Sequence, residues 1–179
     1  AKTKKLKVAV GYNLRFDKGI NLLKHKLQQK EIGKPLSILI TFGHNIKFWR
    51  PGTNYKNHYI LKKGGGIILD GSHEYDYLRW LFEDEIKSVY CQTRSTDSIK
   101  TETESFASIM LKTKKGLIAN LNIDYLRPFY ERSCYIIGEK GSLRWEYNLT
   151  KSAWSTYTQK VNSKVTLQLL SKSSSQVFN

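Results

Sequence analysis

The second half of the sequence alternates between apolar and polar side chains with a period of two residues. The alternation runs through IKSVYCQTRS at 86–95, ESFASIMLKTKKGLIANLNIDYL at 104–126, RSCYIIGEKGSLRWEYN at 132–148 and KVTLQLL at 164–170. Such a period places successive side chains on opposite faces of an extended chain, as in strands with one buried face. TKKG and GEKG, within the second and third segments, are typical of hairpin turns with glycine at the strained position. The pattern predicts a run of antiparallel strands.

The first half of the sequence predicts helices and one further strand. Residues 20–30, INLLKHKLQQK, are amphipathic with helical spacing, and the glycine and proline of EIGKP end that helix. LSILITFGH at 36–44 is rich in β-branched residues and predicts a strand, whereas residues 6–12 predict a weak strand or a lead-in segment. Residues 72–82 predict a second helix. We therefore expect an α+β fold with helices on one face of a sheet.

The second predicted helix has a start signal and two distinguishable faces. Ser72 is a favourable N-cap residue. Helical spacing places one set of side chains on one face and a second set on another. The first set is Tyr75, Leu78 and Phe82, and the second is His73, Asp76, Tyr77 and Trp80.

The chain is strongly basic, with 30 Lys and Arg against 15 Asp and Glu, a formal charge of +15 and a pI near 9.8. Such a charge attracts nucleic acid, anionic membranes or anionic substrates. The basic residues are scattered, however, and no zinc-ligand pairs, RNP-like strand or basic heptads occur, so we do not expect nucleic-acid binding. No apolar run approaches a membrane span, and two separated cysteines are typical of a reducing compartment. We expect a cytoplasmic protein that does not associate with membranes.

The segment KKGGGIILDGSHEYDYLRWLF at 62–82 concentrates the residues with chemical potential. A phosphate-binding loop is disfavoured because neither G-x-x-x-x-G-K-[ST] nor G-x-G-x-x-G occurs in the chain. Asp70, His73 and Asp76 have a spacing of low specificity for metals, so no metal site is predicted. Two interpretations remain equally open. His73 could transfer a proton, kept neutral by the start of a helix and oriented by Asp70. Alternatively, Asp70 and Ser72 only cap a helix after a glycine turn.

Several segments, taken in order, resemble the C-terminal substrate-binding domain of the glucose–fructose oxidoreductase, inositol dehydrogenase and MocA-type family of NAD(P)-dependent oxidoreductases. The resemblance spans roughly residues 8–148. It rests on VGYNLRF at 10–16, LQQKEIGKPLSILITFGH at 27–44, the stretch from Phe48 to Phe82, NIDYL at 122–126 and IIGEKGSLRWEYN at 136–148. It implies an open, mostly antiparallel sheet that mediates homo-oligomerisation. The domain would occupy residues 8–170, between a basic segment at 1–7 and a Ser/Lys-rich, poorly ordered tail at 171–179.

The resemblance also implies roles for individual residues. His73 would be the general acid/base, Asp70 its substrate-positioning partner, and Asn13 a neighbour of the nicotinamide. The sugar or polyol pocket would be lined by Arg15, Trp49, Arg50, Tyr55, Tyr59 and Lys63. The commoner family motif places the histidine four residues after the aspartate, whereas His73 follows Asp70 by three.

The family's dinucleotide-binding Rossmann domain has no counterpart in this sequence. NAD or NADP would act in the intact enzyme, and we expect no cofactor to bind this chain alone. The expectation is therefore a truncated or excised domain that is inactive by itself, alone or beside a Rossmann-domain partner. The alternatives are a non-catalytic oligomerisation module and a basic nucleic-acid-binding domain.

Overall fold

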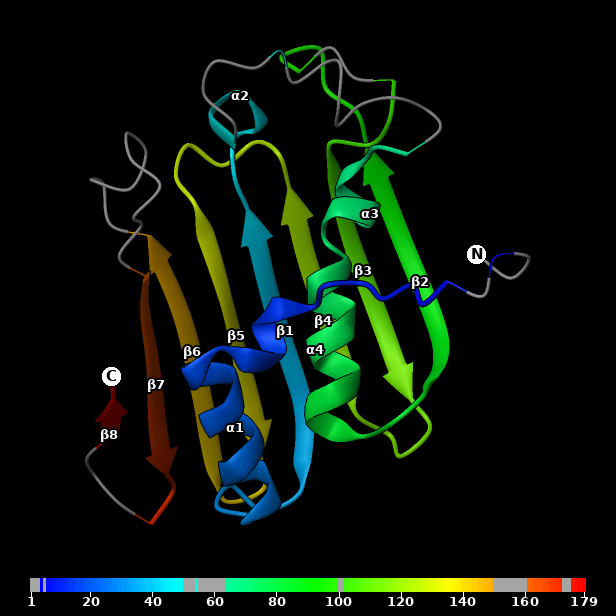
Figure 1. Cartoon of the computed structure of the whole chain (residues 1–179). Coiled ribbons are helices and arrows are strands. Elements are labelled where there is room, and N and C mark those ends of the chain that lie inside the picture. The colour runs from blue at the N-terminus through cyan, green and yellow to red at the C-terminus, as the bar shows by residue number, and fades with distance from the viewer. Residues whose placement is uncertain are drawn as a thin grey trace.

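The computed structural model describes residues 4, 6–49, 54, 64–99, 102–149, 161–171 and 175–179. Within these residues, eight strands form one open sheet in the order β2-β3-β4-β1-β5-β6-β7-β8 (Figure 1). The strands are β1 Pro35–Gly43, β2 Ile86–Arg94, β3 Phe106–Thr113, β4 Ile118–Asp124, β5 Glu131–Gly138, β6 Gly141–Leu149, β7 Val161–Leu169 and β8 Ser175–Phe178. All neighbours are antiparallel except β1 and β4, which are parallel. The predicted α+β class and the mostly antiparallel sheet are confirmed.

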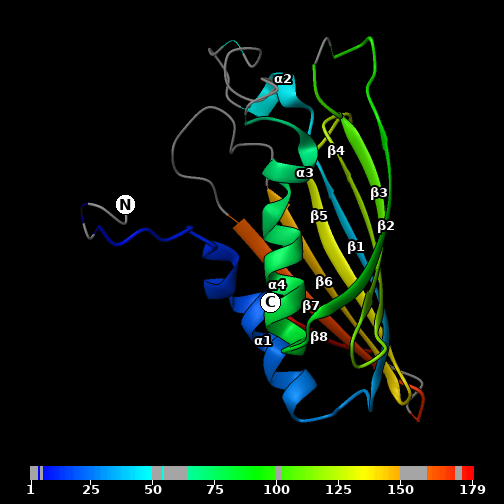
Figure 2. The same ribbon diagram turned by 90° about the vertical axis from the view of Figure 1, so that its right-hand side faces the viewer.

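The longer helices lie together on one face of the sheet (Figure 2). The helical elements are the 3-10 helix η1 Asn13–Phe16 and the α-helices α1 Lys18–Gln28, α2 Ile46–Trp49, α3 Ile67–Asp70 and α4 Ser72–Phe82. β1 shows why this face is covered, because Ile38, Ile40 and Phe42 alternate along it and are at most 1% exposed. Among the described residues, Trp145 of β6 is the largest side chain that is fully buried. The core therefore lies between the helices and the sheet.

Two details of the predicted helices are wrong. The first helix begins at Lys18 because Asp17 is its N-cap and its Oδ1 accepts a hydrogen bond from the backbone N–H of Ile20 at 3.0 Å. α4 has the predicted bounds, but Gly71 occupies its N-cap position and no side chain caps it, so Ser72 is not the cap. The buried face of α4 consists of Glu74, Tyr77, Leu78 and Leu81. The buried positions follow the i, i+3, i+4, i+7 spacing from Glu74 and include one residue of each predicted face, Leu78 and Tyr77.

The two terminal segments also differ from the structure that the sequence predicts. Residues 6–12 form no strand and lead into η1. The tail was predicted to be poorly ordered, yet Ser175–Phe178 forms β8, antiparallel to β7. Phe178 explains this, because its ring packs against the core and lies 4.1 Å from Lys26 Nζ. One apolar side chain thus anchors a polar segment.

The two predicted hairpin turns use glycine for different reasons. Gly116 has a φ of 97°, in the region that favours glycine. Gly138 has no such angle, but a Cβ there would lie 2.3 Å from the carbonyl oxygen of Ile32. That oxygen also accepts a hydrogen bond from Lys140 N–H at 2.8 Å and cannot move away freely. The second turn therefore needs glycine for close approach.

Gly138→Ala should lower the free energy of unfolding by about 1–3 kcal/mol, because the added methyl group would force the backbone at Ile32 to shift. Urea denaturation measures the change. Gly11→Ala is the matched control, since a Cβ at Gly11 meets nothing within 4 Å. Its effect should stay within about 0.5 kcal/mol. Equal effects of the two substitutions would contradict the close approach.

Candidate functional site

The glycine-rich segment before Asp70 places α3 against the loop that precedes β3. Gly66 has a φ of 109°, and a Cβ there would lie 2.3 Å from Glu104 Oε1. That carboxylate oxygen accepts a hydrogen bond from Ile68 N–H at 3.1 Å, and the Glu104 carbonyl accepts one from Ile67 N–H at 3.2 Å. Glu104 therefore holds the start of α3. The glycine provides both the backbone angle and the room for this carboxylate.

Asp70 is the last residue of α3, and a residue that follows strand β4 holds its carboxylate. The hydroxyl of Tyr125, which follows β4, donates a hydrogen bond to Asp70 Oδ2 at 2.5 Å. Tyr125 is fully buried, and its ring meets that of Trp49 edge to face at a centroid distance of 5.5 Å. Two predicted site residues, Asp70 and Trp49, are thus brought to one place by a tyrosine that the sequence analysis did not assign.

His73 lies in the first turn of α4 and is half-buried. Its Nδ1 is buried without a hydrogen-bond partner among the described residues, and its ring meets Tyr12 edge to face at 5.7 Å. Burial lowers the pKa of His73, the positive charge of Arg132 lowers it further, and Asp76 partly opposes both. The imidazole is therefore neutral at neutral pH. The sequence predicted a neutral ring from the helix start, and burial is the main cause found.

Arg15 links the N-terminal segment to α4 beside His73. Its Nε donates to Asp76 Oδ2 at 2.8 Å and its Nη2 to Oδ1 at 2.5 Å. Its guanidinium carbon also lies 5.9 Å from the ring centroid of Tyr12, the residue that meets His73. Asn13 is exposed on the same 3-10 helix as Arg15. Arg15, Asp76, Tyr12 and His73 therefore form one group. Arg50, Tyr55, Tyr59 and Lys63, also predicted to line the pocket, lie outside the described residues.

A buried ion pair supports α4 directly after His73. Glu74 is fully buried, and its Oε1 lies 2.8 Å from Nε of Arg132 on β5. The guanidinium of Arg132 also lies 4.2 Å from the ring centroid of Phe42. Burial raises the pKa of Glu74, and the charge of Arg132 opposes that rise. The pair joins α4 to the sheet below the candidate site.

His44, directly after β1, extends the site toward α2. It is 2% exposed, and its ring meets Trp49 at 6.1 Å and Tyr130 at 5.6 Å, both edge to face. Burial lowers its pKa from 6.5 to about 4. His44 and Tyr130 were not assigned from the sequence, since an isolated histidine or tyrosine has no spacing that marks it.

The low pKa of His44 predicts an acid-sensitive fold. The unfolded chain binds a proton at His44 below about pH 6.5, whereas the folded chain binds it only below about pH 4. The free energy of unfolding should therefore fall as the pH decreases through this window. We expect the stability difference between the wild type and His44→Gln to change by about 2 kcal/mol between pH 7 and pH 5. Urea denaturation at both pH values measures it, with His25→Gln, at an exposed position of α1, as the control. A stability difference between the wild type and His44→Gln that is the same at pH 7 and pH 5 would contradict the low pKa of His44.

The two carboxylates of the site have different partners. Asp70 accepts from Tyr125, whereas Asp76 pairs with Arg15. In the part of the chain that the structure describes, no three His, Cys, Asp or Glu residues are grouped to hold a metal ion.

None of the described helices is long and apolar enough to span a bilayer.

Comparison with known proteins agrees with this fold. The model of the GFO/IDH/MocA C-terminal domain family matches residues 20–144. The chain is 30% identical over 148 residues to an inositol 2-dehydrogenase/D-chiro-inositol 3-dehydrogenase of Lacticaseibacillus casei, covering 80% of this chain and 39% of that protein. It is 28% identical over 139 residues to an inositol 2-dehydrogenase of Klebsiella pneumoniae, covering 76% of this chain and 38% of that protein. The chain thus spans about two-fifths of the length of these relatives.

Solved structures of related proteins have the same fold as this chain. A myo-inositol dehydrogenase from Lactobacillus casei, in complex with NAD(H) and myo-inositol, superposes with a TM-score of 0.63 and 27% identity, covering 89% of this chain and 45% of that one. An inositol dehydrogenase homologue from Azotobacter vinelandii superposes with a TM-score of 0.72 and 16% identity, covering 96% of this chain and 42% of that one. The fold and the matching family thus define an α+β domain of the kind found in oxidoreductases. The chain belongs to the GFO/IDH/MocA C-terminal domain family.

Proposed function

We propose that this chain is the substrate-binding part of an NAD(P)-dependent oxidoreductase that acts on a cyclitol or a related polyol. The observation that carries the proposal is the half-buried imidazole of His73, whose pKa burial lowers and whose Nδ1 has no hydrogen-bond partner among the described residues. Asp70, three residues earlier in the sequence, accepts a hydrogen bond from the Tyr125 hydroxyl. An imidazole that is neutral at the pH of the reaction can accept a proton from a hydroxyl group. The relatives named above are inositol dehydrogenases, which supports a polyol as the substrate.

The reaction divides between this chain and a bound dinucleotide. Oxidation of a secondary alcohol releases a hydride from carbon and a proton from oxygen, and a bound nicotinamide supplies the hydride acceptor. His73 takes the hydroxyl proton as the carbonyl forms. Asp70 accepts a hydrogen bond from a substrate hydroxyl, and the Tyr125 hydroxyl keeps its carboxylate in place. Asn13, exposed on η1, is available to the nicotinamide end of the cofactor.

The polar and aromatic groups of the site suit a ring that carries several hydroxyls. Arg15 supplies guanidinium N–H donors and Asp76 carboxylate acceptors, while Trp49 supplies an apolar ring surface. A few placed polar groups on an apolar wall are the usual composition of a small-molecule site. The assay is NADH formation from myo-inositol by a protein that carries this domain together with a dinucleotide-binding domain. We expect turnover that depends on the polyol. Absence of turnover with cyclitols and simple sugars alike would contradict the proposal.

A second role is suggested by the sheet face that carries no helices. One row of side chains crosses all eight strands there, because strand register aligns them, and β4, β6 and β7 contribute the polar members Asn120, Arg144 and Thr166. Its apolar members, each 38–62% exposed in the single chain, are Tyr90, Met110, Leu39, Tyr135 and Val177. An exposed apolar patch of this kind commonly marks a protein interface. We propose that this face joins copies of the chain.

Leu39→Glu should therefore disrupt oligomers of this chain. Leu39 is 50% exposed on the central strand, and a buried carboxylate at a paired sheet face would lose its hydration. Size-exclusion chromatography with light scattering should give a mass of at least two chains for the wild type and 20.8 kDa for the variant. Leu170→Glu, at a position that is 81% exposed outside the strands, is the control. A wild-type mass of one chain at every concentration would refute this role.

A further inference from the structure

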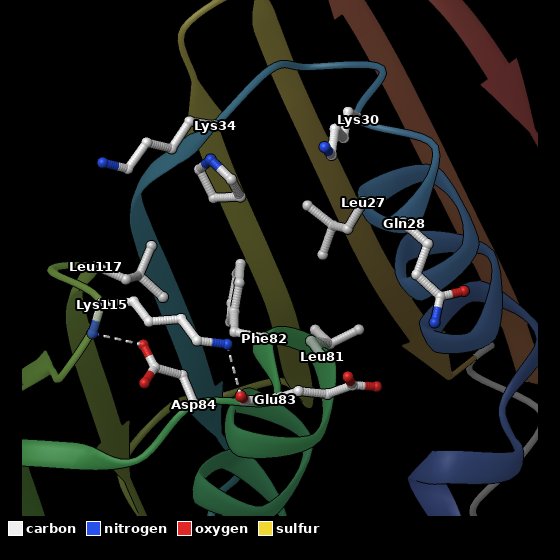
Figure 3. A pocket seen from close by; sticks show the side chains of 11 residues that line it. Leu27, Gln28, Lys30, Lys34, Leu81, Phe82, Glu83, Asp84, Lys115 and Leu117 are labelled. Carbon is white, nitrogen blue, oxygen red and sulfur yellow. Dashed lines mark hydrogen bonds between the residues drawn. The ribbon is translucent and has the colours of Figure 1, made fainter.

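The helix that carries His73 is held at its two ends in different ways. At its C-terminal end, Lys115 of the β3–β4 hairpin donates a hydrogen bond from its backbone N–H to Asp84 Oδ2 at 3.1 Å and one from its Nζ to the carbonyl of Glu83 at 3.0 Å. Figure 3 shows both bonds beside a cavity of about 460 Å³. Both are exposed, so water and salt screen the charges at this end of α4.

The N-terminal end of α4 is held by a buried charge on the sheet. Glu74, the residue after His73, has a fully buried side chain, and its Oε1 lies 2.8 Å from Nε of Arg132, whose side chain is 11% exposed. The N–H of Glu74 donates to the carbonyl of Gly71 at 3.1 Å, which places Glu74 in the first turn of the helix. The pair with Arg132 therefore fixes the turn that carries His73.

Arg132 lies among aromatic rings of the candidate site. In the strand register, it stands on β5 between Phe42 of β1 and Tyr147 of β6. Its guanidinium carbon lies 4.2 Å from the ring centroid of Phe42 and 5.6 Å from that of Tyr130, the ring that also meets His44. Because rings and not water surround this charge, it acts over a longer distance than an exposed charge does.

The positive charge is the permanent member of the buried pair. A guanidinium group stays protonated in proteins. Burial raises the pKa of Glu74 and so disfavours its negative form, although the charge of Arg132 opposes that rise. Among the described residues, Glu74 is the acid that forms an ion pair with Arg132. The sheet therefore presents a lasting positive charge beneath the first turn of α4.

The other groups that face His73 have a different effect. Tyr12, from the N-terminal segment, contributes an uncharged ring whose centroid lies 5.7 Å from that of the imidazole. Asp76, on α4 itself, pairs with Arg15, whose side chain is 42% exposed. Burial lowers the pKa of His73, Arg132 lowers it further, and Asp76 raises it. Among the described residues, Arg132 is thus the charged group that opposes protonation of the imidazole.

We propose that Arg132 is a positioning residue of the candidate site: it fixes the turn that carries His73 through Glu74, and its buried charge keeps the imidazole in the neutral form that accepts a proton. The inference rests on the proposed function, because it assigns Arg132 to the same site. When the substrate hydroxyl gives its proton to His73, the imidazole becomes positively charged, and Arg132 then favours transfer of that proton to water. The base is thereby free again for the next turnover, and it stays free at a lower pH than it would without Arg132.

The test measures the protonation midpoint of His73 in this chain alone, by NMR of the imidazole Cε1–H signal during a pH titration. The chain has four histidines, and the His73 signal is identified by its absence from His73→Gln. We expect a midpoint at higher pH in Glu74→Leu/Arg132→Met, which leaves no unpaired charge in the core. Arg132→Met, in which Glu74 can take up a proton, should shift the midpoint in the same direction.

Two further variants separate charge from anchoring. Arg132→Lys keeps the positive charge and should retain the wild-type midpoint. Lys115→Met removes a charge that holds the other end of α4, and Glu83, to which Lys115 donates, lies about 15 Å along the helix axis from His73. Because that charge is exposed and distant, Lys115→Met should leave the midpoint of His73 unchanged.

Kinetics of the same variants distinguish a failure of this inference from a failure of the proposed function. In a protein that also carries a dinucleotide-binding domain, kcat/KM for polyol oxidation should fall at low pH with the midpoint of His73. The ratio of kcat/KM at pH 6 to kcat/KM at pH 8 should then be at least about threefold lower in Glu74→Leu/Arg132→Met than in the wild type. If no polyol is oxidised, the proposed function fails, whereas the NMR midpoints still decide the role of Arg132.

Two results would overturn the inference. A wild-type midpoint of His73 in both variants that lack Arg132, in chains whose amide spectra show an intact fold, would mean that this charge does not reach the imidazole. A shift of equal size in Lys115→Met would mean that loosening of α4, and not the charge of Arg132, changes the protonation of His73.

Discussion

Replacing His73 by alanine should lower kcat for polyol oxidation by about 10²–10⁴-fold, the range expected when a general base is removed. The imidazole is half-buried, its Nδ1 has no partner among the described residues, and burial keeps its pKa low. Such a group can accept a proton when the hydroxyl is oxidised but contributes little to binding the intact polyol. KM should therefore change far less than kcat. Steady-state kinetics in a protein that carries this domain and a dinucleotide-binding domain measures both.

The control for this prediction separates the base from its surroundings. His25→Ala replaces an exposed histidine of α1 and should leave both constants unchanged. Asp70→Asn keeps the size of the side chain that accepts a hydrogen bond from the Tyr125 hydroxyl but removes its charge. This substitution should raise KM as well as lower kcat. A His73→Ala enzyme that retains wild-type kcat would remove His73 from the proton-transfer role.

Breaking the Glu74–Arg132 pair should cause the largest loss of stability, and the two single substitutions should differ. Glu74→Leu leaves a buried guanidinium that cannot lose its proton, so we expect a loss of about 3–5 kcal/mol. Arg132→Met leaves a carboxyl group whose pKa burial already raises and which can take up a proton. Its loss should therefore be smaller, although Met also gives up the contact with the Phe42 ring. Urea denaturation at pH 7 compares the two.

The double substitution identifies the cause. Glu74→Leu/Arg132→Met removes both buried charges and should recover most of the stability, because the cost of each single change lies in the charge left unpaired. Glu85→Ala is the matched control, since it breaks an exposed pair with Lys114 that water screens, and it should change the stability far less than either single substitution. Additive losses in the double variant would indicate that packing, and not charge, dominates at this position.

Much of the fold was predictable because it depends on local periodicity. The alternation after residue 86 predicted β2 to β7, and helical spacing predicted α4 with its bounds. The errors arose where distant residues decide. Ser72 is not the cap of α4, because Gly71 occupies that position. Glu74 is fully buried because Arg132, distant in the sequence, pairs with it. No pattern in the helix itself marks a buried carboxylate.

The site was predictable only in part, for the same reason. Asp70 and His73 stand three residues apart and could be selected together from the sequence. The partners that fix them lie on other elements, such as Tyr125 for Asp70 and Tyr12 for His73. The pair of Arg15 with Asp76 spans 61 residues of sequence. Such contacts depend on how η1 and the sheet pack around α4. The spacing of residues along the sequence does not predict that packing.

Chemical rescue of the His73→Ala enzyme by added imidazole tests the central claim most directly. If His73 is the base that accepts the hydroxyl proton, imidazole and its methyl derivatives should restore polyol-dependent NADH formation in the variant. The restored rate should rise with the basicity of the added amine and should be absent from His25→Ala controls, which lack nothing to rescue. An inactive variant that no added base restores, while its fold and its affinity for the polyol are intact, would contradict the assignment of His73 and the mechanism built on it.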